Sequence, residues 1–259
     1  MIQRVLTSIL LISICIFFFI KGTNYIVSLL IIITLLSSYE LGNLIFKSKK
    51  DIIITTTINL LLLLISLKFQ LIWESPFTLI TLTLIWIIFL IEIKQKSLTK
   101  NIVINYLKSI ILISFSFPYI MLILNKDQAI FLTLLLCIII WTCDSFCLII
   151  GKKLGKKSLS IASPNKTIEG SIGGVICSTL ISWFFLYSQS KFNYYFLLIP
   201  FFMSIITQIG DLYESKLKRH ANVKDSSNLL PGHGGILDRC DSFLIGLPAY
   251  YILLTLLGL

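Results

Sequence analysis

The chain has 259 residues, of which 56% are hydrophobic and only 13% charged, and its formal net charge is +10. This composition lies outside the range of water-soluble domains and is typical of proteins that cross a membrane several times. The two polar stretches, roughly 151–170 and 214–241, are each too short to bury a core of their own. A separate soluble domain is therefore excluded, and any polar substrate must bind at the face of a membrane protein.

Apolar runs long enough to cross a hydrocarbon core of about 30 Å predict nine helices. They lie near 5–20, 25–46, 52–67, 76–93, 104–124, 129–150, 171–188, 194–213 and 242–259. The first run follows Arg4, but no small-residue cleavage site precedes Lys21, so we interpret it as a helix and not as a signal peptide. The run 104–124 contains Lys108 and Pro118, which are unusual within a span.

The expected fold is all-α, a polytopic integral membrane protein with one transmembrane domain over 1–259. We expect its N-terminal helices to occupy about 1–125 and its catalytic helices and cytoplasmic loops to occupy about 126–259. With nine crossings, 17 of the 22 Lys and Arg residues lie on the side of the N-terminus and four on the other side. Cytoplasmic loops carry the excess of Lys and Arg. The N-terminus and both polar stretches are therefore expected in the cytoplasm, although without these two stretches the ratio falls to seven against four.

Four aspartates lie near the expected cytoplasmic ends of helices. Asp144 is about six residues, or about 9 Å, from that end of the sixth helix, Asp211 is within one turn of that end of the eighth, and Asp238 and Asp241 stand where the ninth begins. Acids inside a membrane are rare and mark functional sites by default. Glu40 and Glu92 are interpreted as structural residues.

Asp238 and Asp241 are three positions apart, so a helix would place their carboxylates on one face. Together with Asp211 they would form an all-oxygen site of the kind that binds Mg²⁺ along with substrate phosphates. One alternative is that these acids only form ion pairs with cations of the same segment, Lys218, Arg219 and Arg239. For Asp144, a hydrogen bond in helix packing is an equal alternative.

A glycine-rich loop, Pro231-Gly-His-Gly-Gly235, precedes the last aspartates. Its glycines permit positive φ angles and close approach, so its amides could hold phosphate oxygens just before a helix N-terminus. The loop becomes a specific signal only in combination with Asp238-Arg-Cys-Asp241. His233 fits either a hydrogen bond that stabilises the turn or a direct contact with substrate.

The segment 215–241 as a whole resembles the signature of the phosphatidate cytidylyltransferases, or CDP-diacylglycerol synthases. The matching parts are Ser215, Lys218-Arg219, Lys224-Asp225, Pro231-x-His-Gly-Gly235 and Asp238-Arg-x-Asp241, over 27 consecutive positions. Cys240 is the one departure, since the family usually has an aliphatic residue or Thr there. The resemblance implies that CTP and phosphatidate react to CDP-diacylglycerol and pyrophosphate. It also implies a two-metal centre, with Mg²⁺ and a second cation that is either Mg²⁺ or monovalent.

In the polar stretch 151–170, Ser163-Pro-Asn-Lys-Thr-Ile-Glu-Gly170 resembles a second block of the same family, with Asn165 where Lys is more usual. Glu169 is expected to orient Lys166. The basic run before this block fits attachment to anionic lipids: Lys152, Lys153, Lys156 and Lys157.

The resemblance assigns metal binding to Asp211, Asp238 and Asp241, and catalysis to these three with Lys218, Arg219 and Arg239. It assigns substrate binding to Asp144, Ser163, Lys166, Thr167, Lys224, Asp225, His233, Gly234 and Gly235. The partners it implies are CTP, phosphatidate and membrane lipids, without nucleic acid, and a homodimer is left open. The expected location is the cell (inner) membrane, with the active site facing the cytoplasm.

The expected chemistry needs no general base, because a phosphate monoester with a second pKa of about 6 is already largely anionic near pH 7. It needs neutralisation and in-line alignment of two polyanions. A CTP-dependent lipid or polyprenol kinase is the nearest alternative. A secondary transporter is the non-enzyme alternative, but its acids would lie near the midplane on broken, repeated helices. A CDP-alcohol phosphotransferase would need a longer Asp-Gly-x-x-Ala-Arg pattern that this chain lacks.

Overall fold

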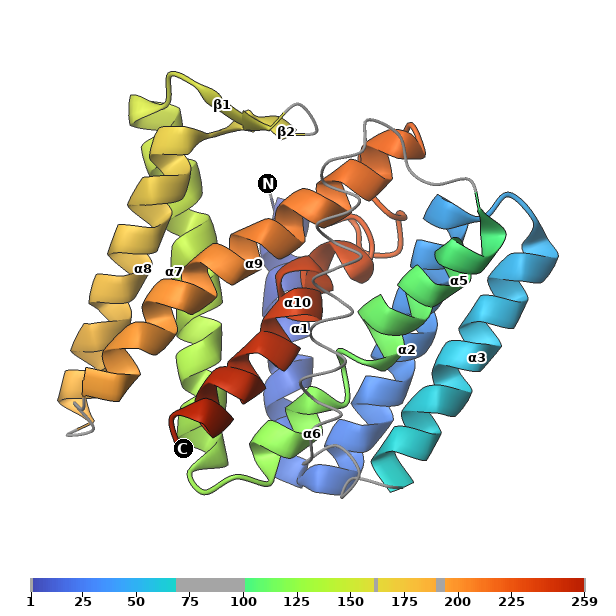
Figure 1. Cartoon of the computed structure of the whole chain (residues 1–259), viewed down its shortest axis with the longest axis horizontal. Coiled ribbons are helices and arrows are strands. Elements are labelled where there is room, and N and C mark those ends of the chain that lie inside the picture. The colour runs from blue at the N-terminus through green and yellow to red at the C-terminus, as the bar shows by residue number, and fades with distance from the viewer. Residues whose placement is uncertain (1, 69–100, 161–162, 190–193, 259) are drawn as a thin grey trace. The chain divides into compact units, whose positions relative to one another are not determined.

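The computed structural model describes residues 2–68, 101–160, 163–189 and 194–258, whose regular structure is helical apart from one small hairpin; a loop over 221–236 separates the last two helices (Figure 1). The expected helix near 76–93, with Glu92, lies outside the described residues. The chain forms two compact units. Of the described residues, the first unit holds those up to 68 with 101–118 and 217–240, and the second holds 119–216 and 241–258.

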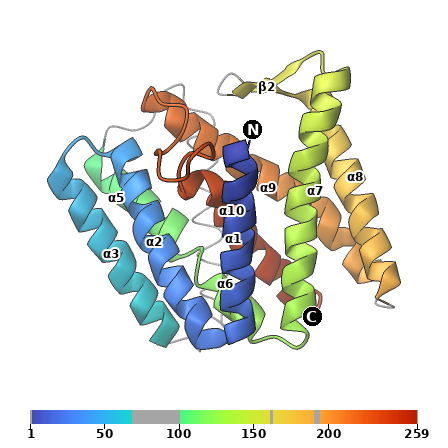
Figure 2. The same cartoon turned by 180° about the vertical axis from the view of Figure 1, so that it is seen from behind.

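The first unit contains helices α1 (Ile2–Lys21), α2 (Thr23–Ile45), α3 (Lys49–Lys68) and α5 (Ile102–Ser109). Helices α2 and α3 run side by side (Figure 2). Gly42 permits this approach, because a Cβ there would lie 3.1 Å from Cγ2 of Ile52. Asn59 of α3 donates to Ser109 Oγ at 2.9 Å and accepts from Ser114 Oγ at 2.7 Å. These buried hydrogen bonds satisfy polar groups inside an apolar unit and fix α5 against α3.

The expected single helix over 104–124 is divided. Helix α5 continues as a π-helix, η2 (Ile110–Ser114), then a turn over 115–118 leads to α6 (Tyr119–Leu124). The amide of Phe115 reaches back five residues to Ile110 O at 3.3 Å. Pro118 has no amide hydrogen and its ring displaces the preceding helical turn, which explains the break.

The second unit is built around helices α7 (Ala129–Leu154) and α8 (Ile168–Ser188), which pack along their length (Figures 1 and 2). Glycines lie in the contact between them. A Cβ on Gly170 would lie 2.6 Å from Cys147 O and 2.9 Å from Gly151 Cα, and a Cβ on Gly174 would lie 2.2 Å from Cys147 Sγ. Gly170 and Gly174, at and just after the end of the polar stretch 151–170, therefore allow the two helices to come into close contact.

A short antiparallel hairpin joins these two helices, with strands β1 (Ser158–Ser160) and β2 (Ser163–Thr167). Its register pairs Ser158 with Thr167 and Ser160 with Ser163. The all-α expectation did not include it, because strands this short and polar have no alternating apolar pattern.

Helices α9 (Tyr194–His220) and α10 (Leu237–Leu256) complete the described chain. Helix α9 continues past the apolar run 194–213 and includes Lys218, Arg219 and His220 in its last turn, where cations complement the helix dipole. Asp211 is therefore nine residues from the end of its helix, and the expectation of one turn was wrong. Asp144 is ten residues from the end of α7, not six, because that helix continues to Leu154.

Six helical stretches of the described chain, one of them interrupted at 115–118, are long and apolar enough to cross a membrane. These are Thr23–Ile45, Lys49–Lys68, Ile102–Leu124, Ala129–Leu154, Ile168–Ser188 and Phe196–His220. The protein is therefore an α-helical membrane protein, and the count of nine crossings remains a prediction.

Candidate active site

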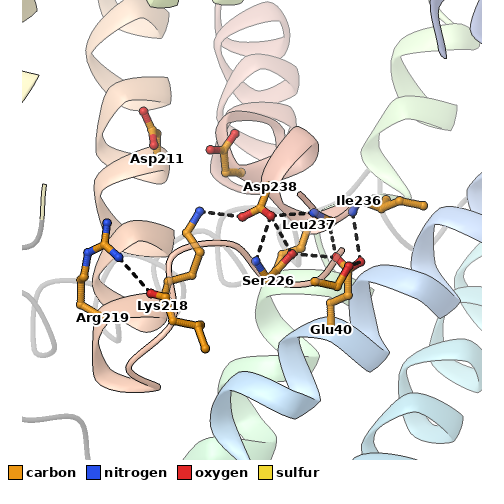
Figure 3. A network of polar contacts seen from close by, with 12 residues as sticks. Glu40, Asp211, Lys218, Arg219, Ser226, Ile236, Leu237 and Asp238 are labelled. Atoms are coloured by element: carbon orange, nitrogen blue, oxygen red, sulfur yellow. Dashed lines mark hydrogen bonds and ion pairs between the residues drawn. The ribbon is translucent and has the colours of Figure 1, made fainter. Parts of the chain in front are cut away.

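Asp238 lies in the first turn of α10 and is buried, with a side chain only 3% exposed. Its Oδ1 accepts from Lys218 Nζ at 2.6 Å. Its Oδ2 accepts from the amide of Ser226 at 2.9 Å, from Ser226 Oγ at 3.0 Å and from the amide of Gly235 at 2.7 Å (Figure 3). All these residues belong to the first unit. The helix start, the last turn of α9 and the loop between them therefore meet at one carboxylate.

These contacts keep Asp238 anionic. Burial alone raises the pKa of a carboxyl group, but here the Lys218 ammonium and the amides of Gly235 and Ser226 outweigh burial. The pKa of Asp238 is consequently lower than that of an ordinary aspartate. The site thus holds a buried, compensated negative charge next to a lysine.

The two glycines before α10 make room for carboxylates. Gly234 has φ +80°, and a Cβ there would lie 2.4 Å from Asp238 Oδ2. A Cβ on Gly235 would lie 2.1 Å from Ser226 Oγ and 2.4 Å from Glu40 Oε2. Any side chain at either position would displace Asp238, Ser226 or Glu40, so the Gly-Gly pair is a structural requirement of this site.

Glu40 of α2 is the residue that the sequence interpretation missed. It is fully buried and its carboxylate is hydrogen-bonded to the loop that carries Ser226 and to the start of α10. The rule that selected Asp144, an acid within an apolar helix, applies equally to Glu40 and was the available signal. Its partners are 186 or more positions away, so the sequence did not indicate them.

The remaining signature residues of the first unit lie in the loop and at the ends of the two helices that flank it. His233 is hydrogen-bonded through Nδ1 to the Thr7 hydroxyl of α1. Arg219 Nη1 donates to Val223 O at 3.0 Å and so closes the end of α9. The other three have exposed side chains: Lys224, Asp225 and Arg239.

In the second unit, Lys166 of β2 forms an ion pair with Asp211 of α9. Thr167 caps the N-terminus of α8, where its hydroxyl accepts from the amide of Gly170 at 3.1 Å. Glu169 Oε2 accepts from the amides of Lys156 and Lys157 at 3.0 and 3.3 Å, so it closes the turn before β1. Lys166 is therefore held by Asp211. The expectation that Glu169 orients it was wrong.

Three other expected ligands belong to the second unit. Ser163 begins β2 opposite Ser160, Asp144 is exposed on α7, and Asp241 Oδ1 accepts from the amide of Ser242 at 2.7 Å. Asp211 and Asp241 belong to the second unit and Asp238 to the first. Over the described ranges, no three His, Cys, Asp or Glu side chains are gathered closely enough to hold a metal ion.

The donor chemistry nevertheless fits a hard cation. Carboxylate oxygens are the ligands that Mg²⁺ prefers. In the structure, Asp211 and Asp238 each direct an oxygen at a lysine ammonium group, and the Lys218–Asp238 pair is the ion pair that the sequence offered as the alternative to a metal site.

Comparison with known proteins agrees with the resemblance in the signature segment. The model of the cytidylyltransferase family matches residues 2–257. The phosphatidate cytidylyltransferase of Bacillus subtilis is 48% identical over 150 residues, which are 56% of this chain and 56% of that protein. Those of Staphylococcus haemolyticus and Staphylococcus aureus are 49% and 48% identical over 121 and 120 residues, in each case 45% of this chain and 46% of the relative. The chain thus spans about half the length of the curated relatives it matches, and the match of the family model shows that it belongs to the cytidylyltransferase family.

Proposed function

We propose that the protein transfers the cytidylyl group of CTP to phosphatidate, giving CDP-diacylglycerol and pyrophosphate. One observation carries this proposal. The buried Lys218–Asp238 pair, with backbone amides at a helix N-terminus, lies inside the segment 215–241 of a chain that the family model matches from residue 2 to 257. Relatives that bear the name phosphatidate cytidylyltransferase support the choice of substrates.

In the proposed step, a phosphate oxygen of phosphatidate forms a bond to the α-phosphorus of CTP. The bond between that phosphorus and the bridging oxygen to the β-phosphate breaks, and pyrophosphate leaves with the electron pair. The attacking oxygen is already anionic, since the second pKa of a phosphate monoester is about 6. The protein's task is therefore to neutralise charge and to align the two phosphates.

Two lysines are suited to that task. Lys166 and Lys218 are each held by an aspartate, so the ammonium groups are fixed before substrate arrives. A fixed cation stabilises developing negative charge without the free-energy cost of reorienting at the moment of reaction. The segment 215–241 supplies further positive charge to the incoming polyanions through three exposed cations, Arg219, Lys224 and Arg239.

We further propose that Asp211, Asp238 and Asp241 hold Mg²⁺ and a second cation, which is either Mg²⁺ or monovalent. When bound, such cations neutralise phosphate oxygens and help to align the attacking and leaving groups. The six apolar helices support a location in the cell membrane, and CTP and pyrophosphate are too polar to cross a bilayer unaided. The active site is thus proposed to face the cytoplasm, and a homodimer is the oligomeric form to test first.

The test is turnover by the purified protein in detergent, with CTP labelled at the α-phosphate and with phosphatidate added or omitted. The expected result is labelled CDP-diacylglycerol and an equal amount of pyrophosphate, formed only when phosphatidate is present. Release of labelled CDP together with a phosphorylated lipid would instead identify a CTP-dependent lipid kinase and overturn the proposal.

A further inference from the structure

Among the described residues of the first unit, Glu40 is a second buried carboxylate whose oxygens, like those of Asp238, accept several hydrogen bonds. Its Oε1 accepts from Ser227 Oγ at 2.6 Å and from the amide of Ile236 at 3.1 Å. Its Oε2 accepts from Ser226 Oγ at 3.0 Å and from the amide of Leu237 at 2.7 Å (Figure 3). The side chain is 0% exposed. Each oxygen therefore accepts from one hydroxyl and one backbone amide.

The two amides lie where α10 begins. The first amides of a helix have no carbonyl partner inside the helix and are usually satisfied by a residue just before it. Here the acceptor comes from α2, 196 and 197 positions earlier in the chain. A carboxylate at this end also complements the positive end of the helix dipole. Glu40 thus acts as the N-terminal cap of α10.

The two hydroxyls lie on the other side of the glycine-rich turn. Ser226 and Ser227 precede Pro231–Gly235, whereas Ile236 and Leu237 follow it. One buried carboxylate therefore holds both sides of the turn. The carboxylate lies so close to the turn that a Cβ on Gly235 would overlap Glu40 Oε2 at 2.4 Å.

Ser226 connects Glu40 with Asp238. Its hydroxyl lies 3.0 Å from Glu40 Oε2 and 3.0 Å from Asp238 Oδ2, and its amide donates to the same Oδ2. A hydroxyl has one proton, so it donates to one of these carboxylates at a time and accommodates both. The position of Asp238 consequently depends on a loop that Glu40 holds.

We propose that Glu40 is a positioning residue, which clamps the two sides of the Pro231–Gly235 turn and thereby sets Asp238 and Lys218 for the reaction. It acts through Ser226 and the amides of α10 and touches no substrate. The clamp rests on the geometry alone, and only its effect on turnover rests on the proposed function.

The test uses Glu40→Gln, which keeps the shape of the side chain. Both carboxylate oxygens accept a backbone amide, so the NH₂ group of Gln must face an N–H donor in either orientation. Losing hydrogen bonds to a charged group is expected to lower kcat about ten- to a hundredfold. The KM for CTP should change less than kcat, because Glu40 contacts no substrate.

Amide hydrogen exchange on the full-length protein in detergent supplies a readout that does not depend on turnover. Peptides that cover 221–240 should exchange faster in Glu40→Gln, whereas peptides of α7 and α8 should be unchanged. Ser37→Ala is the matched control, since Ser37 is buried in the same helix and its hydroxyl has no hydrogen-bond partner in the described part of the chain. It should leave exchange over 221–240 unchanged.

Unchanged exchange over 221–240 in Glu40→Gln would overturn the clamp, whatever the wild-type protein catalyses. A wild-type protein without CTP turnover would refute the proposed function, and the exchange result would still decide the clamp. If Glu40→Gln raises exchange throughout the chain, Ser227→Ala decides instead, because it removes one of the four hydrogen bonds of Glu40 together with the bond from the Leu229 amide to Ser227 Oγ. A rise confined to 221–240 that extends beyond the Leu229 amide supports the clamp, and no rise beyond that amide refutes it.

Discussion

The ammonium group of Lys166, on the second strand of the hairpin, is ion-paired with Oδ2 of Asp211, 45 positions later in α9. The two side chains are 33% and 22% exposed. A partly exposed ion pair of this kind contributes little to stability, typically about 0–1 kcal/mol. The pair is thus better suited to presenting a cation to phosphate than to holding the fold together.

Lys166→Ala should therefore leave the thermal midpoint almost unchanged and lower kcat/KM for CTP by about tenfold or more, since a fixed cation toward phosphate is lost. Initial rates over a range of CTP concentrations measure this. Lys153→Ala is the control, because it removes the same charge from an exposed position in α7. Equal rates for both variants would show that Lys166 only attaches the hairpin to lipid.

The three aspartates should differ in a way that their surroundings explain. Asp211→Asn, Asp238→Asn and Asp241→Asn should each abolish turnover at saturating Mg²⁺, because each removes an anionic oxygen without a change of size. Asp238→Asn should in addition accelerate amide exchange over 221–236, since it also weakens the contacts of Ser226 and Gly235.

Asp127→Asn, at an exposed position between α6 and α7, is the control and should turn over normally. Near-normal turnover by any one of the three variants would remove that aspartate from the proposed metal site.

Gly235→Ala tests the packing of the Gly-Gly pair. The added Cβ would meet Ser226 Oγ at 2.1 Å and Glu40 Oε2 at 2.4 Å, so one of these groups must move. Overpacking of a buried site costs about 1–3 kcal/mol, and we expect a lower thermal midpoint and loss of turnover. Gly246→Ala is the comparison, since its Cβ would meet nothing nearer than Thr207 Cγ2 at 3.3 Å. A thermal midpoint for Gly235→Ala at or above that of Gly246→Ala would contradict the packing.

The apolar runs predicted most of the helices, because a long apolar segment inside a bilayer or a protein core must hydrogen-bond its own backbone. They predicted a helix end wrongly where the residues became polar but the helix continued. Helix α9 continues through Ser215–Arg219 because polar residues do not end a helix in the absence of a breaker. Pro118 broke the expected helix over 104–124 for the converse reason.

The site could be predicted only where its residues lie close together in the sequence. The acids and cations of 215–241 form a local pattern, so the ion pair of Asp238 with Lys218 was one of the two alternatives that the sequence offered for this aspartate. Glu40 has no such pattern, because all its partners lie in a distant part of the chain. The pairing of Lys166 with Asp211 was missed for the same reason. Sequence spacing reports helix faces, whereas contacts between distant segments depend on packing that spacing does not encode.

The orientation of the chain can be tested with positions that the structure shows to be exposed. Helices α7, α8 and α9 are each long and apolar enough to span a membrane, and three crossings put the loop before α7 and the loop after α9 on opposite sides.

Two positions are suitable for single cysteines in a background without the native thiols: Leu229, which is 52% exposed after α9, and Asp127, which is exposed before α7. Ser227 is less suitable because its hydroxyl is held by Glu40, and Ser190 lies outside the described residues. In intact cells, a membrane-impermeant maleimide should label Asp127→Cys and should reach Leu229→Cys only after the membrane is opened. Labelling of Leu229→Cys from outside would place Asp238 away from cytoplasmic CTP, and the proposed cytidylyl transfer could not then proceed.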